Sequence, residues 1–285
     1  LTVARYALAA TGNSTHGYFG GGIPTTAQMD KVTYSSDTTA AVPGANLSAA
    51  RGYVAASSSR ANALPQPPTP TLTSQTVITT VPIGYDTGYF GGGRGDGFPT
   101  SSLMDKVTYA SDTTAAVPGA NLTVARAYLA ATGNSTHGYF GGGSLPGGTA
   151  QMDKVTYASD TTAAVPGANL TVARRQLAAT GNSTHGYFGG GDPTTSLMEK
   201  ITYSSDTTAA VPGANLSSAR EKLAATGNST AGYFGGGDPS GSLMDKVTYA
   251  SDTTAAVPGA NLTVARQALA ASSSRANALP VTGLG

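Results

Sequence analysis

One phrase recurs along this chain of 285 residues, and its period constrains the fold more than any other feature. The phrase joins a glycine-rich turn, Met-Asp-Lys-Val-Thr-Tyr, Thr-Ala-Ala-Val-Pro-Gly-Ala-Asn-Leu and an arginine. Its Gly-Tyr-Phe-Gly-Gly-Gly element begins at Gly17, Gly88, Gly138, Gly186 and Gly232. A period of roughly 46–50 residues is typical of stacked supersecondary units, none of which can bury its apolar face alone.

Each repeat is predicted to contain four short strands. In the repeat that follows Arg126 they span residues 127–132, 137–140, 152–157 and 161–165. The third of them alternates side chains with period two, which is typical of a sheet. We expect its equivalents near 104–109, 198–203 and 244–249, and therefore an all-β fold.

The composition excludes several classes of function but does not point to one. Only 11% of the residues are charged and the formal net charge is +1, which argues against a nucleic-acid partner. The absence of cysteine excludes thiol chemistry and disulfides. No apolar run reaches the length of about eighteen residues that a membrane span requires.

One insertion interrupts the repeats. Residues 66–85 are rich in proline and threonine, which is typical of a semi-rigid linker. The phrase Ala-Ala-Ser-Ser-Ser-Arg-Ala-Asn-Ala-Leu-Pro precedes this linker and recurs near the end of the chain, so it resembles a module terminator. We therefore expect residues 1–65 to be the terminal portion of a first propeller module and residues 86–285 to form a second. Because Leu1 begins within the repeat phrase, we expect a piece of a longer natural chain.

Two blade counts are consistent with this organisation. In the first, the second module is a ring of four blades, in which residues 267–272 supply the missing first strand of the blade that starts at Gly88. In the second, all five glycine turns belong to one ring of five blades and the linker is a long insertion. We favour the first count, since four blades make the smallest usual ring.

The repeat resembles the kelch motif. That motif has an arginine, a hydrophobic strand, an aromatic residue before two glycines, and a strand that ends in tyrosine before a turn. The matching residues here are Arg126, 129–131, 139–142 and 155–160. The resemblance implies a β-propeller, and propellers of this kind usually bind partners. Residues 161–165 lack the tryptophan of the motif, which leaves the packing between blades open.

The polar residues that recur once per blade have a structural interpretation. Catalysis needs a unique, asymmetric pair of groups in a pocket, whereas the Asp-Lys pairs and turn aspartates repeat in every blade. We expect the turn aspartates to bond backbone amides, and the arginines 126, 174, 220 and 266 to be buried and paired. His16, His137 and His185 are expected to be turn residues rather than metal ligands. We therefore predict no catalytic, metal or cofactor site, and no enzyme activity.

The repeats differ at two places, the loop after the glycines and the two residues after the arginine. In a four-stranded blade both places lie on the same rim, where a rigid scaffold usually presents its binding loops. The candidate residues on this face are Arg94, Asp96, Phe98, Tyr128, Asp192 and Asp238. Arg94-Gly95-Asp96 has the form of an integrin-binding tripeptide, which also arises by chance.

These features favour a non-enzymatic structural or adhesive protein of the extracellular space or virion surface. We expect a subunit of a surface filament or viral fibre that self-associates head to tail. The alternative is a multivalent lectin-like propeller that binds surface glycans, although the loops after the glycines contain few aromatic residues.

Overall fold

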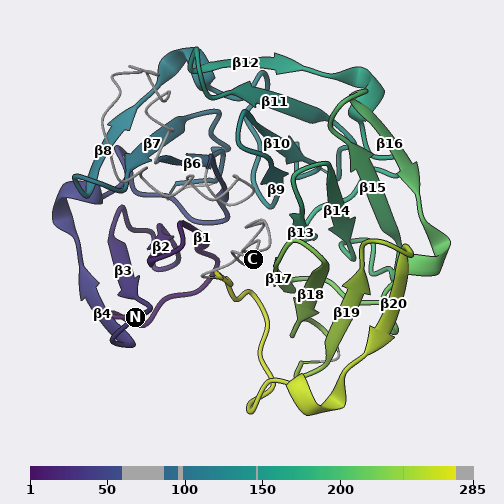
Figure 1. The fold of residues 1–285 in the computed structure, drawn as a ribbon. Helices are drawn as coiled ribbons and strands as arrows, with labels where there is room; N and C mark the ends of the chain where they lie inside the picture. Colours follow the sequence, from purple (N-terminus) through teal and green to yellow (C-terminus); the bar gives the residue numbers. More distant parts are fainter. Residues whose placement is uncertain (60–86, 96–98, 146, 240, 274–285) are drawn as a thin grey trace, which may run out of the picture.

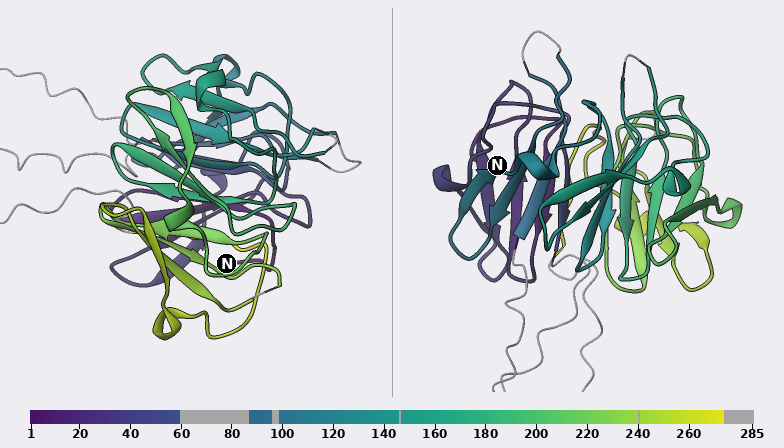
Figure 2. Two further views of the ribbon diagram at one scale, coloured as in Figure 1. Left: turned by 90° about the vertical axis from the view of Figure 1, so that its right-hand side faces the viewer. Right: turned by 90° about the horizontal axis from the view of Figure 1, so that it is seen from above.

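The computed structural model describes residues 1–59, 87–95, 99–145, 147–239 and 241–273. These residues form five four-stranded antiparallel sheets arranged around a central axis (Figure 1). The chain is therefore an all-β propeller, as the repeat predicts. Figure 2 shows the blades from the side, with strands that run between the two mouths of the ring. Among the described residues, no helix is long and apolar enough to cross a membrane.

The four strands of each blade follow the chain outward from the axis. The inner strands are β1 (Ala9–Gly12), β5 (Ala55–Ser58), β9 (Ala130–Gly133), β13 (Ala178–Gly181) and β17 (Ala224–Gly227). The second strands are β2 (His16–Gly20), β6 (Thr87–Gly91), β10 (His137–Gly141), β14 (His185–Gly189) and β18 (Ala231–Gly235). The third are β3 (Met29–Thr33), β7 (Met104–Thr108), β11 (Met152–Thr156), β15 (Met198–Thr202) and β19 (Met244–Thr248). The outer strands are β4 (Thr38–Ala41), β8 (Thr113–Ala116), β12 (Thr161–Ala164), β16 (Thr207–Ala210) and β20 (Thr253–Ala256).

The predicted third strands are confirmed, and so is their alternation. In β11 the side chains of Asp153 and Val155 are fully buried, while Lys154 and Thr156 between them are partly exposed. After each outer strand, Pro-Gly-Ala forms one turn of 3-10 helix, for example Pro118–Ala120, and the chain crosses to the axis of the next blade. We refer to these connections as crossovers.

The blade count differs from the one that the sequence favours. Strand β5 pairs with β6 in register from Ala55–Gly91 to Ser58–Gly88, so the residues on both sides of the linker belong to one blade. The ring of four blades is therefore wrong, and the ring of five is present. The reason is that β5 offers β6 the same small-residue strand that the other inner strands offer, whereas residues 267–272 form no strand. Residues 66–85 lie outside the described part of the chain.

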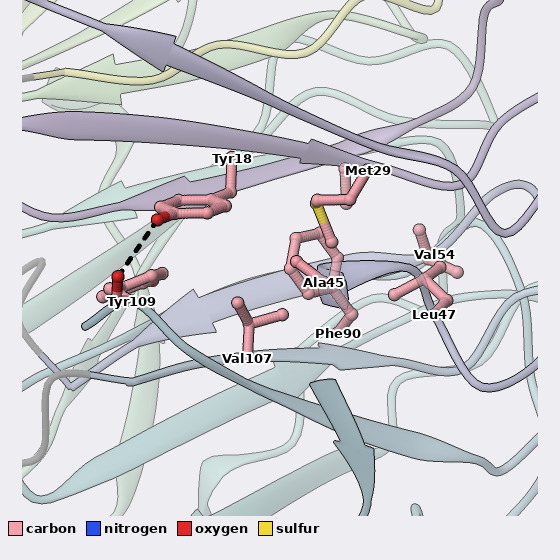
Figure 3. Packing of buried hydrophobic residues seen from close by; sticks show 9 residues of the cluster. Tyr18, Met29, Ala45, Leu47, Val54, Phe90, Val107 and Tyr109 are labelled. Carbon is pink, nitrogen blue, oxygen red and sulfur yellow. Dashed lines mark hydrogen bonds between the residues drawn. The ribbon is translucent and has the colours of Figure 1, made fainter. Parts of the chain in front are cut away.

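The packing between blades uses tyrosine and phenylalanine instead of tryptophan. Between blades 1 and 2, Tyr18 of β2 stacks on Tyr109 at a ring distance of 4.8 Å, while Met29 and Phe90 fill the space beside them (Figure 3). Similar clusters join blades 2 to 3, 3 to 4 and 4 to 5. The outer strands, where the tryptophan is missing, are largely exposed, for example β12.

A buried ion pair joins each crossover to the blade that it enters. Arg126 lies 3.0 Å from Asp153 of β11, and both side chains are fully buried. Arg126 also donates to the carbonyl of Phe140. The same pair recurs as Arg5–Asp30, Arg51–Asp105, Arg174–Glu199 and Arg220–Asp245. The expectation of buried, paired arginines is thus confirmed for Arg126, Arg174 and Arg220.

Arg266 is the exception, and the expectation for it is wrong. Its side chain is exposed, and no ion pair to it is found among the described residues. The physical reason is that Arg266 ends the crossover that leaves blade 5, and no third strand with a carboxylate follows it within the described residues.

A second ion pair joins neighbouring blades at their rims. The turn residue Asp206 accepts hydrogen bonds from Lys154 at 2.8 Å and from the Tyr139 hydroxyl at 2.5 Å, both from the preceding blade. Asp112, Asp160 and Asp252 have the same partners. These four turn aspartates thus bind side chains of the preceding blade, and the expected bonds to backbone amides are not what holds them. Burial alone would raise the pKa of Asp206, but the bonds from Lys154 and Tyr139 lower that pKa below its usual value.

Substitution of the repeated arginine tests the buried pair. Arg126→Ala leaves the Asp153 carboxylate buried without a counter-charge, so it should lower the free energy of unfolding by about 3–5 kcal/mol. Arg266→Ala is the matched control and should change it by less than about 0.5 kcal/mol. Chemical denaturation of both variants measures the two values. If both substitutions change the free energy of unfolding by equally small amounts, the buried pairs do not stabilise the fold.

Acid titration tests the rim pairs. Because the pKa of Asp206 is lowered in the folded state, its contribution to stability is full above the unfolded value of about 3.9 and is lost as the pH falls through the lower folded value. The wild-type protein should therefore lose stability below about pH 4, and Asp206→Asn should lose less. The control is Asp37→Asn at the equivalent turn of blade 1, where the described residues provide no such partners. Identical acid profiles of wild type and Asp206→Asn would contradict the assignment.

Candidate functional site at the axial mouth

The residue two positions after each arginine is held at the axis by its backbone. These residues are Ala7, Tyr53, Tyr128, Gln176, Lys222 and Ala268, and their φ angles lie between 54° and 61°. Each N–H donates to the carbonyl of the preceding member at 2.7–3.1 Å, and Ala7 donates to Ala268 to close the circle. The left-handed backbone, which costs an L-residue about 1–2 kcal/mol, is stabilised by these bonds.

A cavity of about 420 Å³ opens at this end of the axis. Its floor is apolar, since it consists of the residue that follows each member of the circle. The floor residues are Leu8, Val54, Leu129, Leu177, Leu223 and Leu269. Its upper wall carries the variable side chains. We call this cavity and its wall the axial mouth; it has the apolar lining with few polar groups that is typical of small-ligand sites.

Blades 1 to 3 give the axial mouth an aromatic half. The rings of Tyr53 and Tyr128 lie 4.1 Å apart, and Tyr6 adds a third ring that is 49% exposed. The guanidinium of Arg94 lies 4.7 Å from the Tyr53 ring and 5.2 Å from the Tyr128 ring. This arrangement permits cation–π attraction, which fixes Arg94 beside the rings.

Blades 4 and 5 give the axial mouth a charged half, in which Lys222 lines the cavity and the other charged side chains lie beside the lining residues. Lys222 lies 2.7 Å from Glu221 and 3.4 Å from Asp238, and the hydrogen bond to Glu221 raises the pKa of its ammonium group. On the neighbouring blade, Arg175 contacts Asp192 at 2.6 Å. All of these side chains are partly exposed, so they can exchange these partners for a ligand.

The two variable zones of the repeat meet on one face, as expected. Isolated backbone bridges join them in every blade, for example Gly52 to Arg94 and Arg175 to Asp192. Of the candidate residues, Arg94 and Tyr128 lie together in the aromatic half, whereas Asp192 and Asp238 belong to the charged half. Asp96 and Phe98 lie outside the described residues, so the Arg-Gly-Asp tripeptide stays a prediction.

Sequence reasoning identified the variable positions but missed their convergence. Tyr6, Tyr53 and Tyr128 are distant along the chain. The circle of backbone bonds brings Tyr53, Tyr128 and Ala7, the neighbour of Tyr6, to the axis. The available signal was the repeat register, since all three occupy the two positions that follow the arginine.

The histidines lie away from the axial mouth. His137 opens β10, where its N–H donates to the side chain of Asn134 and its Nδ1 is 2.8 Å from the Thr136 hydroxyl. Burial lowers the pKa of His137 and of its equivalent His185, and a neighbouring lysine adds to this effect. Within the described ranges, no group of three or more His, Cys, Asp or Glu side chains could hold a metal ion. The arrangement at the axial mouth is thus suited to binding a ligand by stacking and hydrogen bonds.

The comparisons with known proteins leave the axial mouth as the main evidence for function. No family model matches the chain. No curated protein matches its sequence.

Proposed function

We propose that this chain is a non-enzymatic structural or adhesive repeat protein that binds a partner at the axial mouth. The observation that carries the proposal is the contrast between a nearly uniform scaffold and a mouth whose side chains differ from blade to blade. Binding sites are commonly built in this way, from variable residues on a rigid framework. The axial mouth also combines aromatic surface with charged groups, as binding surfaces commonly do.

The recurring carboxylates support a structural rather than a catalytic role. Asp153 and its equivalents are buried in pairs with arginine, and Asp206 and three of its equivalents bind lysine and tyrosine of the preceding blade. These groups are engaged in holding the fold, so they do not form the poised acid–base pair that catalysis requires. The arginine, the aromatic residue before two glycines and the tyrosine that directly follows the third strand support kinship with kelch-type propellers.

The proposed setting is a surface filament or viral fibre outside the cell. It is supported by nearly identical repeats, by a composition rich in small residues and by the absence of cysteine. A filament needs contacts between neighbouring units, and we propose that the units associate head to tail. A heterologous contact of this kind gives an open chain of units when its rotation does not close.

A glycan is the second candidate ligand, and the aromatic half of the axial mouth favours it. The rings of Tyr6, Tyr53 and Tyr128 can stack on a sugar, while Arg94 and Gln176 can bond its hydroxyl groups. A multivalent lectin of this architecture would have one weak site in each blade. The convergence of three tyrosines at the axis favours one shared site instead.

A glycan-binding assay tests this site. Wild-type protein on an array of surface glycans should bind a subset of them, and Tyr128→Ala should weaken binding by roughly 5–100-fold, the loss of about 1–3 kcal/mol of contact energy. The control is Arg175→Ala, which alters the opposite side of the axial mouth. A wild-type protein that binds no glycan on the array would leave a protein partner as the adhesive ligand, and equal losses in both variants would contradict a site in the aromatic half.

Imaging tests the filament. Negative-stain images of the purified protein at high concentration should show linear chains of rings, and light scattering should show a mass that grows with concentration. A stable monomer under all these conditions would contradict head-to-tail assembly.

A further inference from the structure

Among the described residues, the ring has six positions at its axis but five complete blades. The circle of backbone bonds includes Ala268, which lies beyond blade 5, and it closes from there to Ala7 of blade 1. Ser272 also stands against blade 1 as Thr11 stands against blade 2. A Cβ on Gly17 would lie 3.0 Å from Ser272, and one on Gly88 would lie 2.7 Å from Thr11. Residues 261–273 thus occupy the place of the crossover and inner strand of a sixth blade.

The three outer strands of that sixth blade are missing from the described chain. All twenty strands belong to the five sheets, so none occupies this position. Figure 1 shows the open side of the ring between blade 1, next to the N-terminus, and β20 of blade 5, with the yellow segment crossing it. We call this region the open side.

Blade 5 presents unsatisfied groups to the open side. Elsewhere the Ala of each crossover, for example Ala214, is fully buried, but Ala260 is exposed. A Cβ on Gly259 would meet nothing within 4 Å, whereas one on Gly213 would lie 2.9 Å from the Asp252 carbonyl of the next blade. Thr226 Oγ1 is buried without a hydrogen-bond partner, although the equivalent Thr132 bonds the tyrosine of the next blade at 3.0 Å.

The charges of blade 5 follow the same pattern. Lys31, Lys106, Lys154 and Lys200 each pair with a turn aspartate of the following blade. Lys246 is the fifth member of this series, and no described residue pairs with it. Tyr233 likewise lacks the stacked tyrosine that its four equivalents have.

Blade 1 presents the complementary half of the same contact. Phe19 and Val32 are partly exposed, although the equivalent Phe140 and Val155 are fully buried. The turn residue Asp37 is exposed and has no lysine or tyrosine partner among the described residues. Arg266, on the crossover between the two faces, is exposed without its carboxylate.

We propose that the open side is a docking site for the three outer strands of one further repeat, supplied from outside residues 1–285. Residues 134–168 show what such a segment would contribute. By the register of the other blades, the equivalent of Asp153 would face Arg266, that of Asp160 would face Lys246 and Tyr233, and that of Lys154 would face Asp37. Two anionic groups would thus meet two cations, and one cation would meet an anion, so the charges are complementary.

Residues 1–285 contain no equally suitable occupant. Residues 60–86 and 274–285 lack the Gly-Tyr-Phe-Gly-Gly-Gly and Met-Asp-Lys-Val-Thr-Tyr elements. A second copy folded in the same way has all of its described outer strands engaged in its own blades. The donor is therefore a repeat that lies outside residues 1–285 and is not already part of a ring.

A synthetic peptide with the sequence of residues 134–168 tests the proposal on the full chain. At a hundredfold excess over its Kd, the peptide should raise the melting temperature by about 5–10 °C. Arg266→Ala should weaken peptide binding at least about tenfold by calorimetry while leaving the melting temperature of the free chain unchanged. The matched control peptide carries Asp153→Ala and Asp160→Ala and should bind equally weakly to wild type.

If the peptide is insoluble, a fusion protein tests the same proposal. In this variant, a copy of residues 134–168 replaces residues 274–285, directly after the inner segment of the sixth position. The fusion should melt at a higher temperature than the original chain, and Arg266→Ala should now lower its melting temperature. No gain in either format, or a gain that Arg266→Ala does not reduce, would overturn the proposal.

Two further outcomes distinguish other occupants. The first outcome is a dimer that Lys246→Ala or Arg266→Ala abolishes and that the peptide does not dissociate. It would show that a second copy covers the open side, and it would overturn the proposal. The proposal would also be overturned if the peptide does not bind and neither Lys246→Ala nor Arg266→Ala changes the melting temperature. Tyr128→Ala should leave peptide binding unchanged, so a failure of the proposed glycan site does not affect this inference.

Discussion

The buried pair of an arginine and a carboxylate is the interaction on which each blade depends. It joins the end of a crossover to the third strand of the blade that follows, as in Arg126 with Asp153. Two charges removed from water cost several kcal/mol each unless they meet each other, so the crossover is stable only where that strand is present. The arginine of a crossover is therefore buried only where the third strand of the following blade is present. This explains why Arg266, which no strand of the described residues follows, is exposed.

Each blade also depends on its neighbours to bury its apolar side chains. Tyr139 of β10 packs towards the following blade, whereas Phe140 beside it packs towards the preceding one. Because neighbouring residues of a strand face opposite sides, one short strand contributes to two clusters. A blade without a neighbour consequently exposes only one of its two aromatic residues, as Tyr233 and Phe19 show at the two ends of the series.

The sequence predicts the local structure well because strand alternation and turns depend on neighbouring residues. The third strands and their buried faces follow from Met-Asp-Lys-Val-Thr-Tyr alone. The blade count and the environment of Arg266 could not be predicted in the same way, since residues 247–266 have the same sequence as residues 107–126. What differs is the number of blades that close around the axis, which is a property of the whole ring. The convergence of Tyr53 and Tyr128 at the axial mouth depends on that property too.

The circle of backbone bonds at the axis has a mechanical consequence. Between blades 1 and 5 the described connections are the bond from Ala7 to Ala268 and the contact of Tyr34 with Ser272, both near the axis. Every other junction also has a rim pair and an apolar cluster. A force that pulls neighbouring blades apart at the rim would therefore break the contacts between blades 1 and 5 first. The ring would open at that junction, while the apolar clusters of the other four junctions stay packed.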